Sequence, residues 1–138
     1  MTTTVVRIYT PISGFIEHHC GPILSGLDAG IMDYYQDLGE AYAGFVDDDF
    51  VCCWGLVPPT FLSDEAYLWM WTFGPLAHQF LFIRHSQIQV KKFLSRYDSI
   101  RGHCKLNAHS AQRWLRWLGA KFSEPVNGTR PFVINRSA

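Results

Sequence analysis

The sequence lacks the features that mark several large classes of protein. Its 138 residues contain no apolar run that approaches the roughly 20 residues of a membrane-spanning helix. The N-terminal segment 1–7 has too short an apolar run for a secretory signal peptide. Twelve Lys and Arg residues balance twelve Asp and Glu residues, and this lack of a basic surplus gives no indication of a nucleic-acid partner. We therefore expect no membrane span, no export and no nucleic acid.

The spacing of the cysteines fits no standard framework. There are four cysteines, of which Cys52 and Cys53 are adjacent in an apolar run, and CxxC is absent. Without an export signal, we expect reduced thiols buried in a cytosolic protein. The His–Cys clusters at 18–20 and 103–104 could be imagined as a zinc site, but their spacing matches no zinc motif. Packed cysteines and surface histidines are the favoured interpretation, and no metal is expected.

What the sequence does contain is a large apolar and aromatic fraction. It is 48% hydrophobic and 15% aromatic, which is typical of a folded chain and not of a disordered one. The length suits one domain, which we place at 1–138. No internal repeat or low-complexity linker interrupts it.

Apolar periodicity and turn residues predict strands that alternate with helices. Strands are expected at 4–10, 40–46, 50–57, 66–73, 99–106, 120–125 and 131–136. Helices are expected at about 11–38, interrupted at Gly21–Pro22, at about 75–97, and between Asn107 and Gly119. This order predicts a single α/β domain around a mixed sheet.

Several residues are expected to shape the ends of these elements. Thr10 should cap the first helix, and Ser110 or Asn107 the last one, which Gly119 should end with a positive φ. Asn127–Gly128 is a strong signal for a hairpin turn. The three carboxylates at 47–49 are interpreted as a solvated hairpin tip in preference to a cation site.

The segment from Asn107 to Gly119 resembles the C-terminal half of a Gcn5-related N-acetyltransferase (GNAT) domain. Many GNAT domains place an Asn at the end of the fifth strand, followed by an Ala-containing helix that ends in an aromatic residue or Leu, a basic residue, a bulky residue, Leu and Gly. The comparable residues here are Asn107, Ala111, Leu115, Arg116, Leu118 and Gly119. The resemblance implies a GNAT-like α/β fold, with a mixed, mostly antiparallel sheet flanked by helices. It also implies bound acetyl-CoA if the protein is an active enzyme.

The same resemblance places a pyrophosphate-binding loop between the fourth strand and the long helix. In the family this loop reads Arg or Gln, two residues, Gly, one residue, and Gly or Ala, so that backbone N–H groups can approach the phosphates at a helix N-terminus. The chain has Thr72, Phe73, Gly74 and Pro75 there, with one glycine and one residue that lacks an N–H. The resemblance therefore gives Thr72, Phe73, Gly74 and Asn107 as candidate cofactor-binding residues, within a loop that departs from the family pattern.

The catalytic residues are not predicted. Where the family often has a general-acid Tyr, this chain has Leu115. Tyr97 or His103 could substitute for it, and Glu40 or Glu65 could act as a base. For both glutamates, a surface carboxylate is the favoured interpretation.

A narrower resemblance rests on three aromatic-rich stretches, at 54–59, 96–100 and 113–120. They are similar to small acetyltransferase-like proteins of tailed bacteriophages, a group that includes internal virion proteins. The resemblance implies a virion-associated or morphogenesis protein that works by protein–protein binding without a cofactor. It would occur in the host cytoplasm during assembly and then in the virion, with other virion or tail proteins, or a second copy, as partners. The alternative is an acetyl-CoA-dependent N-acetyltransferase with an atypical cofactor motif.

One residue bears on the binding interpretation. Trp117 lies about 110° from the centre of the apolar face of its helix. We therefore expect its side chain to be exposed, and exposed aromatic residues favour protein interfaces.

Overall fold

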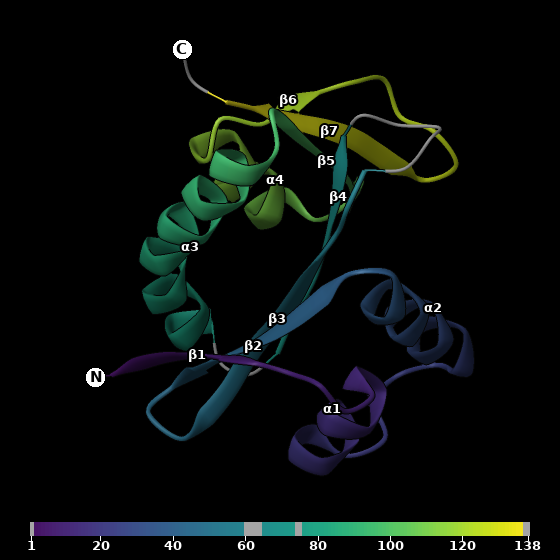
Figure 1. Ribbon diagram of the computed structural model, residues 1–138, viewed down its shortest axis with the longest axis vertical. Coiled ribbons are helices and arrows are strands. Elements are labelled where there is room, and N and C mark those ends of the chain that lie inside the picture. Colours follow the sequence, from purple (N-terminus) through teal and green to yellow (C-terminus); the bar gives the residue numbers. More distant parts are fainter. Residues whose placement is uncertain (1, 60–64, 74–75, 137–138) are drawn as a thin grey trace. The chain divides into compact units, whose positions relative to one another are not determined.

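A computed structural model describes residues 2–59, 65–73 and 76–136, without the side chains of residues 76–84. The observed elements follow the predicted order. They are β1 (Thr3–Arg7), α1 (Ile12–Cys20), α2 (Gly26–Leu38), β2 (Glu40–Val46), β3 (Asp49–Val57), β4 (Ala66–Thr72), α3 (Leu76–Arg96), β5 (Ser99–Lys105), α4 (His109–Trp117), β6 (Lys121–Phe122) and β7 (Thr129–Asn135) (Figure 1). A search of the described helices finds none with the length and apolar character of a membrane span.

The seven strands described form one mixed sheet in the order β1-β2-β3-β4-β5-β7-β6. β4 and β5 are parallel, whereas β1–β2, β2–β3, β5–β7 and β6–β7 are antiparallel. The mixed, mostly antiparallel α/β class expected from the sequence is therefore confirmed. The chain divides into two compact units, one of residues 1–58 with 70–82 and the other of residues 59–69 with 83–138.

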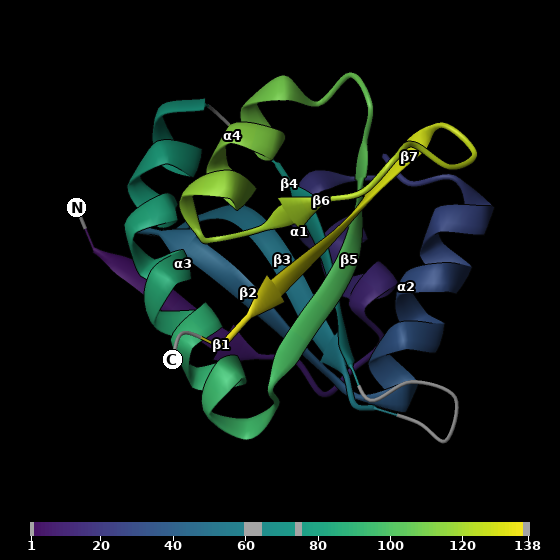
Figure 2. The same ribbon diagram turned by 90° about the horizontal axis from the view of Figure 1, so that it is seen from above.

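The first unit contains a β1–β2–β3 meander that packs with α1 and α2 (Figure 2). Ile12 and Ile16 of α1 and Met32 of α2 are fully buried in its core. β2 and β3 are joined by a two-residue turn in which Asp47 has a φ of 53°. Asp47, Asp48 and Asp49 are exposed, as expected for a solvated hairpin tip.

The predicted break in the first helix is confirmed, but the predicted cap is wrong. α1 ends before Gly21, whose φ of 80° is a conformation that glycine tolerates. The residue before α1 is Pro11 rather than Thr10, and its side chain makes no cap hydrogen bond. The free N–H groups of this helix end are instead satisfied from α2, where Gln36 and Asp33 accept hydrogen bonds from the backbone of Ile12 and Ser13.

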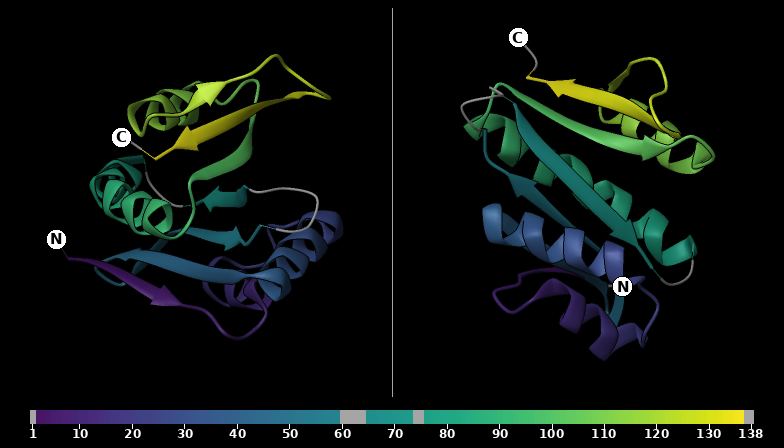
Figure 3. Two further views of the ribbon diagram at one scale, coloured as in Figure 1. Left: turned by 45° about the horizontal axis from the view of Figure 1, so that its top comes forward. Right: turned by 90° about the vertical axis from the view of Figure 1, so that its right-hand side faces the viewer.

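The second unit contains the antiparallel β5–β7 and β6–β7 pairs (Figure 3). Along β5, Ile100, Gly102 and Cys104 are buried while the alternate residues are more exposed, so one face of this strand faces the core. Phe132 and Ile134 of β7 are paired with Gly102 and Ile100 and are buried on that face.

α4 confirms the predicted end but not the predicted start. Its N-cap is Ala108, with no side-chain cap hydrogen bond, so neither Ser110 nor Asn107 has that role. After α4, Gly119 has a φ of 97°. The N–H groups of Gly119 and Ala120 bond to the carbonyls of Arg116 and Leu115, which is the Schellman pattern.

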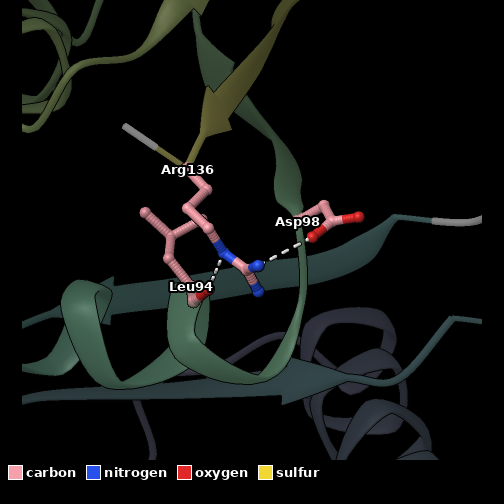
Figure 4. Close-up of polar contacts among 3 residues, drawn as sticks. All are labelled: Leu94, Asp98 and Arg136. Carbon is pink, nitrogen blue, oxygen red and sulfur yellow. Dashed lines mark hydrogen bonds and ion pairs between the residues drawn. The ribbon is translucent and has the colours of Figure 1, made fainter. Parts of the chain in front are cut away.

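The C-terminal hairpin is also confirmed. Asn127 and Gly128 have φ angles of 50° and 79°, which suit the predicted tight turn. Just after β7, Arg136 donates from Nε to the carbonyl of Leu94 at 2.6 Å and pairs through Nη1 with Asp98 at 3.0 Å (Figure 4). These bonds fasten the end of β7 to the end of α3 and to the turn that follows it.

Candidate functional site

Three of the four predicted cofactor residues are consecutive at 72–74, and the fourth, Asn107, follows β5. Thr72 is the exposed last residue of β4, and Gly74 lies outside the described residues. Phe73 donates its backbone N–H to the carbonyl of Val51 at 2.7 Å, so this donor is already used. Asn107 is exposed in the turn between β5 and α4. Their role in binding a cofactor stays a prediction.

The second unit holds a polar pair that sequence reasoning did not bring together. β4 and β5 run in parallel with Tyr67 opposite Arg101. The phenol oxygen of Tyr67 lies 3.2 Å from Nδ1 of His103, and the guanidinium of Arg101 lies 5.1 Å from the centroid of the Tyr67 ring. Because side chains alternate along a strand, Arg101 and His103 project from the same face of β5.

The surroundings of this pair favour the neutral form of the His103 imidazole. Burial lowers the pKa of His103 from its ordinary 6.5, and the positive charge of Arg101 lowers it further. His103 is nevertheless exposed enough to meet a solute. A neutral imidazole held by a phenol can accept a proton near pH 7, which is the property of a general base.

The other residues that the sequence raised for catalysis have structural partners. Leu115 is buried in the core. Tyr97 follows α3, where the guanidinium of Arg96 lies 5.2 Å from its ring centroid. Glu65 accepts a hydrogen bond from Oγ of Ser99 at 3.0 Å. His103, by contrast, is paired with the phenol of Tyr67, a second polar side chain suited to proton transfer.

The first unit has a hollow of about 490 Å³ lined by Arg7, Ile8, Tyr9, Pro11, Asp33, Gln36, Asp37, Gly39, Glu40 and Ala41. Glu40, the other candidate base, lies on its wall. Asp33 is occupied by two hydrogen bonds from Ser13, and Gln36 by three bonds to backbone atoms. These two side chains are therefore explained by their structural role at the start of α1.

The buried cysteine side chains serve in packing, and His19 has aromatic neighbours. His19 contacts the rings of Phe15, Phe45 and Phe50. Burial raises the pKa of the Cys52 thiol to about 12. The free thiols of Cys52, Cys53 and Cys104 are buried as expected, whereas Cys20 is half-buried. Across the described ranges, no three His, Cys, Asp or Glu side chains are grouped to hold a metal.

Charge is divided unevenly between the two units. The first unit has one basic and eight acidic residues, a formal net charge of −7, and the second has eleven basic and four acidic residues, a net charge of +7. The balanced total conceals this division. The uneven division of charge can be seen in the sequence, because residues 8–83 contain neither Lys nor Arg.

Comparison with known proteins identifies the fold. No protein-family model and no curated protein sequence matches the chain. Among solved structures, an acetyltransferase of Bacillus subtilis in complex with CoA is similar with a TM-score of 0.74 and 11% identity, over 99% of this chain and all of that one (100%).

Two further structures agree. A GNAT-family acetyltransferase of Staphylococcus aureus matches with a TM-score of 0.68 and 12% identity, over 97% of this chain and 99% of that one. The ribosomal L7/L12 N-acetyltransferase RimL in complex with CoA matches with a TM-score of 0.59 and 11% identity, over 82% of this chain and 74% of that one. None of the three is described as a phage or virion protein. The chain therefore has the fold of the Gcn5-related N-acetyltransferases.

Proposed function

We propose that the protein transfers an acetyl group from acetyl-CoA to an amine, with His103 as the general base. The observation that carries the proposal is the Tyr67–His103 pair on β4 and β5, in a fold whose solved examples include CoA complexes. The virion-binding role inferred from the aromatic stretches has no counterpart among those examples. Acetyl transfer is therefore preferred to it.

The pair can supply the proton transfer that the reaction needs. Acetyl-CoA, when bound, supplies a thioester whose C–S bond breaks as the amine N–C bond forms, and the proton lost by the amine nitrogen ends on the sulfur. With its own hydrogen on Nδ1 directed to the phenol oxygen of Tyr67, His103 presents the lone pair of Nε2 to an amine. The lowered pKa keeps that lone pair available at neutral pH.

Charge supports the same pair of substrates. CoA carries several phosphate charges, which suit the second unit with its net charge of +7. A protonated amine suits the first unit with its net charge of −7. The phosphate contacts themselves are not assigned, because Gly74 and Pro75 lie outside the described residues.

The test combines binding with turnover. If the dissociation constant is near 0.1 mM, acetyl-CoA at about 1 mM should stabilise the protein by about 1.4 kcal/mol, a shift that a thermal melt detects. Acetylation of a panel of mono- and polyamines, followed by mass spectrometry, should show transfer. His103→Gln should lower the rate by about 10²-fold or more, and Tyr67→Phe should move its pH profile.

His109→Gln, which changes an exposed histidine on α4, is the matched control and should keep the wild-type rate. Absence of both stabilisation and transfer would count against acetyl transfer altogether. Full activity in His103→Gln would leave the reaction in place and remove His103 as its base.

A further inference from the structure

α2 carries an apolar surface on the side that faces away from its own unit. Its outer face consists of Leu27, Tyr34, Asp37 and Leu38, which recur at helical spacing opposite the fully buried Met32. The exposed fractions of Leu27, Tyr34 and Leu38 are 74%, 61% and 48%. Single exposed apolar residues are common, but three aligned on one helix face form a patch of the kind used in interfaces.

α4 carries a second exposed surface of different chemistry. Its outer face consists of Arg113, Arg116 and Trp117, opposite the buried Leu115. Trp117 is 50% exposed, which confirms the expectation from its helical position. The guanidinium of Arg116 is held 5.0 Å from the ring centroid of Phe122. Trp and Arg are the side chains that most often dominate binding energy at protein interfaces.

We propose that the outer face of α2 in one copy of the chain docks on the outer face of α4 in a second copy. The two faces are complementary in charge, since the first belongs to the unit of net charge −7 and the second to the unit of +7. The carboxylate of Asp37 meets the guanidinium of Arg113 at the edge of this contact. Leu27 and Leu38 cover the indole of Trp117.

A second copy fits these faces better than other partners do. Pairing α2 with α2 would bring the Asp37 carboxylates of the two outer faces together, and α2 has no basic residue to offset them. A nucleic acid could contact the Arg and Trp side chains of α4, but it would be repelled by the acidic unit and would leave the α2 face bare.

The contact is heterologous, because it joins two different faces. A pair therefore keeps one unused α4 face on one copy and one unused α2 face on the other, so that association can continue to a ring or an open chain. Each face consists of a few side chains, which places the interface at the small end of the range for specific complexes. We expect weak, reversible association that salt suppresses.

The first experiment measures the mass of the wild-type chain by light scattering and sedimentation. From about 10 μM to about 500 μM protein in about 0.05 M salt, the average mass should rise from one chain to at least two. In about 0.5 M salt it should fall back toward one. A wild-type chain that stays monomeric throughout this range at low salt would overturn the proposal.

The second experiment uses two face variants. One combines Leu27→Ser with Asp37→Lys on α2, and the other combines Arg113→Glu with Trp117→Ser on α4. Each should be monomeric alone. Their 1:1 mixture should form a dimer that grows no further, because one variant supplies an intact α4 face, the other an intact α2 face, and the remaining faces are damaged. Circular dichroism and thermal melts establish that both variants are folded.

Matched controls change the same charges elsewhere. Asp48→Lys, at the β2–β3 turn, and Lys92→Glu, on α3, alter exposed residues of the two units outside both faces and should associate as the wild type does. Failure of the mixed variants to pair would refute a heterologous contact, as would association of either face variant alone. Binding of a labelled single-stranded oligonucleotide to a chain that does not self-associate would assign the α4 face to a polyanion instead.

Discussion

Trp114 donates its indole N–H to the Oγ of Ser86 across 2.9 Å, and this bond joins α4 to α3. Ser86 is 7% exposed, so its hydroxyl has little access to water. Trp114 is next to Leu115, which the GNAT resemblance places at the general-acid position. In this chain, that part of the helix serves packing and not proton transfer.

The first prediction concerns this bond. Ser86→Ala should lower the free energy of unfolding by about 1–2 kcal/mol, because it leaves the indole N–H of Trp114 without its partner in a partly buried place. Adding Trp114→Phe removes the stranded donor, so the loss from Ser86→Ala should be smaller in the Trp114→Phe background. Urea unfolding of the four proteins of this cycle measures the coupling. Equal losses in both backgrounds would mean that the bond contributes nothing.

A second prediction concerns Gly102, in the middle of β5. A methyl group there would lie 2.6 Å from Cζ of Phe132 and 2.8 Å from the carbonyl oxygen of Leu68, which is closer than real contacts allow. Gly102→Ala should therefore destabilise the fold by about 1–3 kcal/mol, as overpacked cores do. Chemical denaturation measures the difference.

Gly14 provides the control for that substitution. It lies within α1, and a methyl group there would meet nothing within 4 Å. Gly14→Ala should therefore stabilise the protein, by about 0.5–1 kcal/mol, because alanine loses less backbone entropy on entering a helix. If Gly102→Ala and Gly14→Ala changed the free energy of unfolding by the same amount, steric crowding at Gly102 would not explain the effect of Gly102→Ala.

The features that could be predicted from sequence depend on a residue's own backbone preference. Gly21, Gly119 and the Asn127–Gly128 turn fall where positive φ angles end a helix or reverse a strand. Asn and Gly adopt such angles at lower cost than other residues do, so the turn positions could be predicted without knowledge of distant residues. The element order followed from the same signals together with the apolar periodicity.

The features that could not be predicted depend on residues far apart in the chain. Thr10 was expected to cap α1 because of its residue type. The acceptor for the N–H of Ile12 is instead the side chain of Gln36, which is 24 positions away from Ile12. Tyr67 and His103 are 36 positions apart, and their contact follows from the parallel register of β4 and β5. No periodicity encodes that register. The phosphate-binding loop stays a prediction, because Gly74 lies outside the described residues.

A third prediction follows from the lowered pKa values of His103 and His19. The folded-state pKa of each histidine lies below the ordinary 6.5. At pH values between the folded-state pKa and 6.5, the unfolded chain therefore binds more protons than the folded chain does. Stability should therefore fall as the pH falls below 6.5 toward the folded-state pKa, and it should be fully present above 6.5.

Denaturation between about pH 5 and about pH 8 tests this dependence. His103→Gln should show a shallower loss of stability at the acidic end than the wild type. His109→Gln, which keeps both shifted histidines, should follow the wild-type curve. A His103→Gln curve parallel to that of the wild type would show that this imidazole titrates alike in the folded and unfolded chains.

A fourth prediction concerns Gln36, whose side chain holds the start of α1. Its Oε1 accepts from the N–H of Ile12 at 2.8 Å, and its Nε2 donates to the carbonyls of Ile8 and Thr10 at 3.0 and 2.7 Å. Since a net hydrogen bond contributes about 1 kcal/mol, Gln36→Ala should lower the free energy of unfolding by about 2–3 kcal/mol.

The substitution Gln36→Glu separates acceptance from donation. A carboxylate can still accept from the N–H of Ile12, but it cannot donate, and it would face the carbonyl oxygens of Ile8 and Thr10. Gln36→Glu should therefore be destabilised at pH 7 and should recover partly as the pH falls toward the carboxyl pKa, where protonation restores one donor. Protection from hydrogen exchange at the N-terminus of α1 should likewise be lower in Gln36→Glu than in the wild type at pH 7 and should recover partly at lower pH. Wild-type stability in Gln36→Glu at pH 7 would show that acceptance from Ile12 alone holds the helix in place.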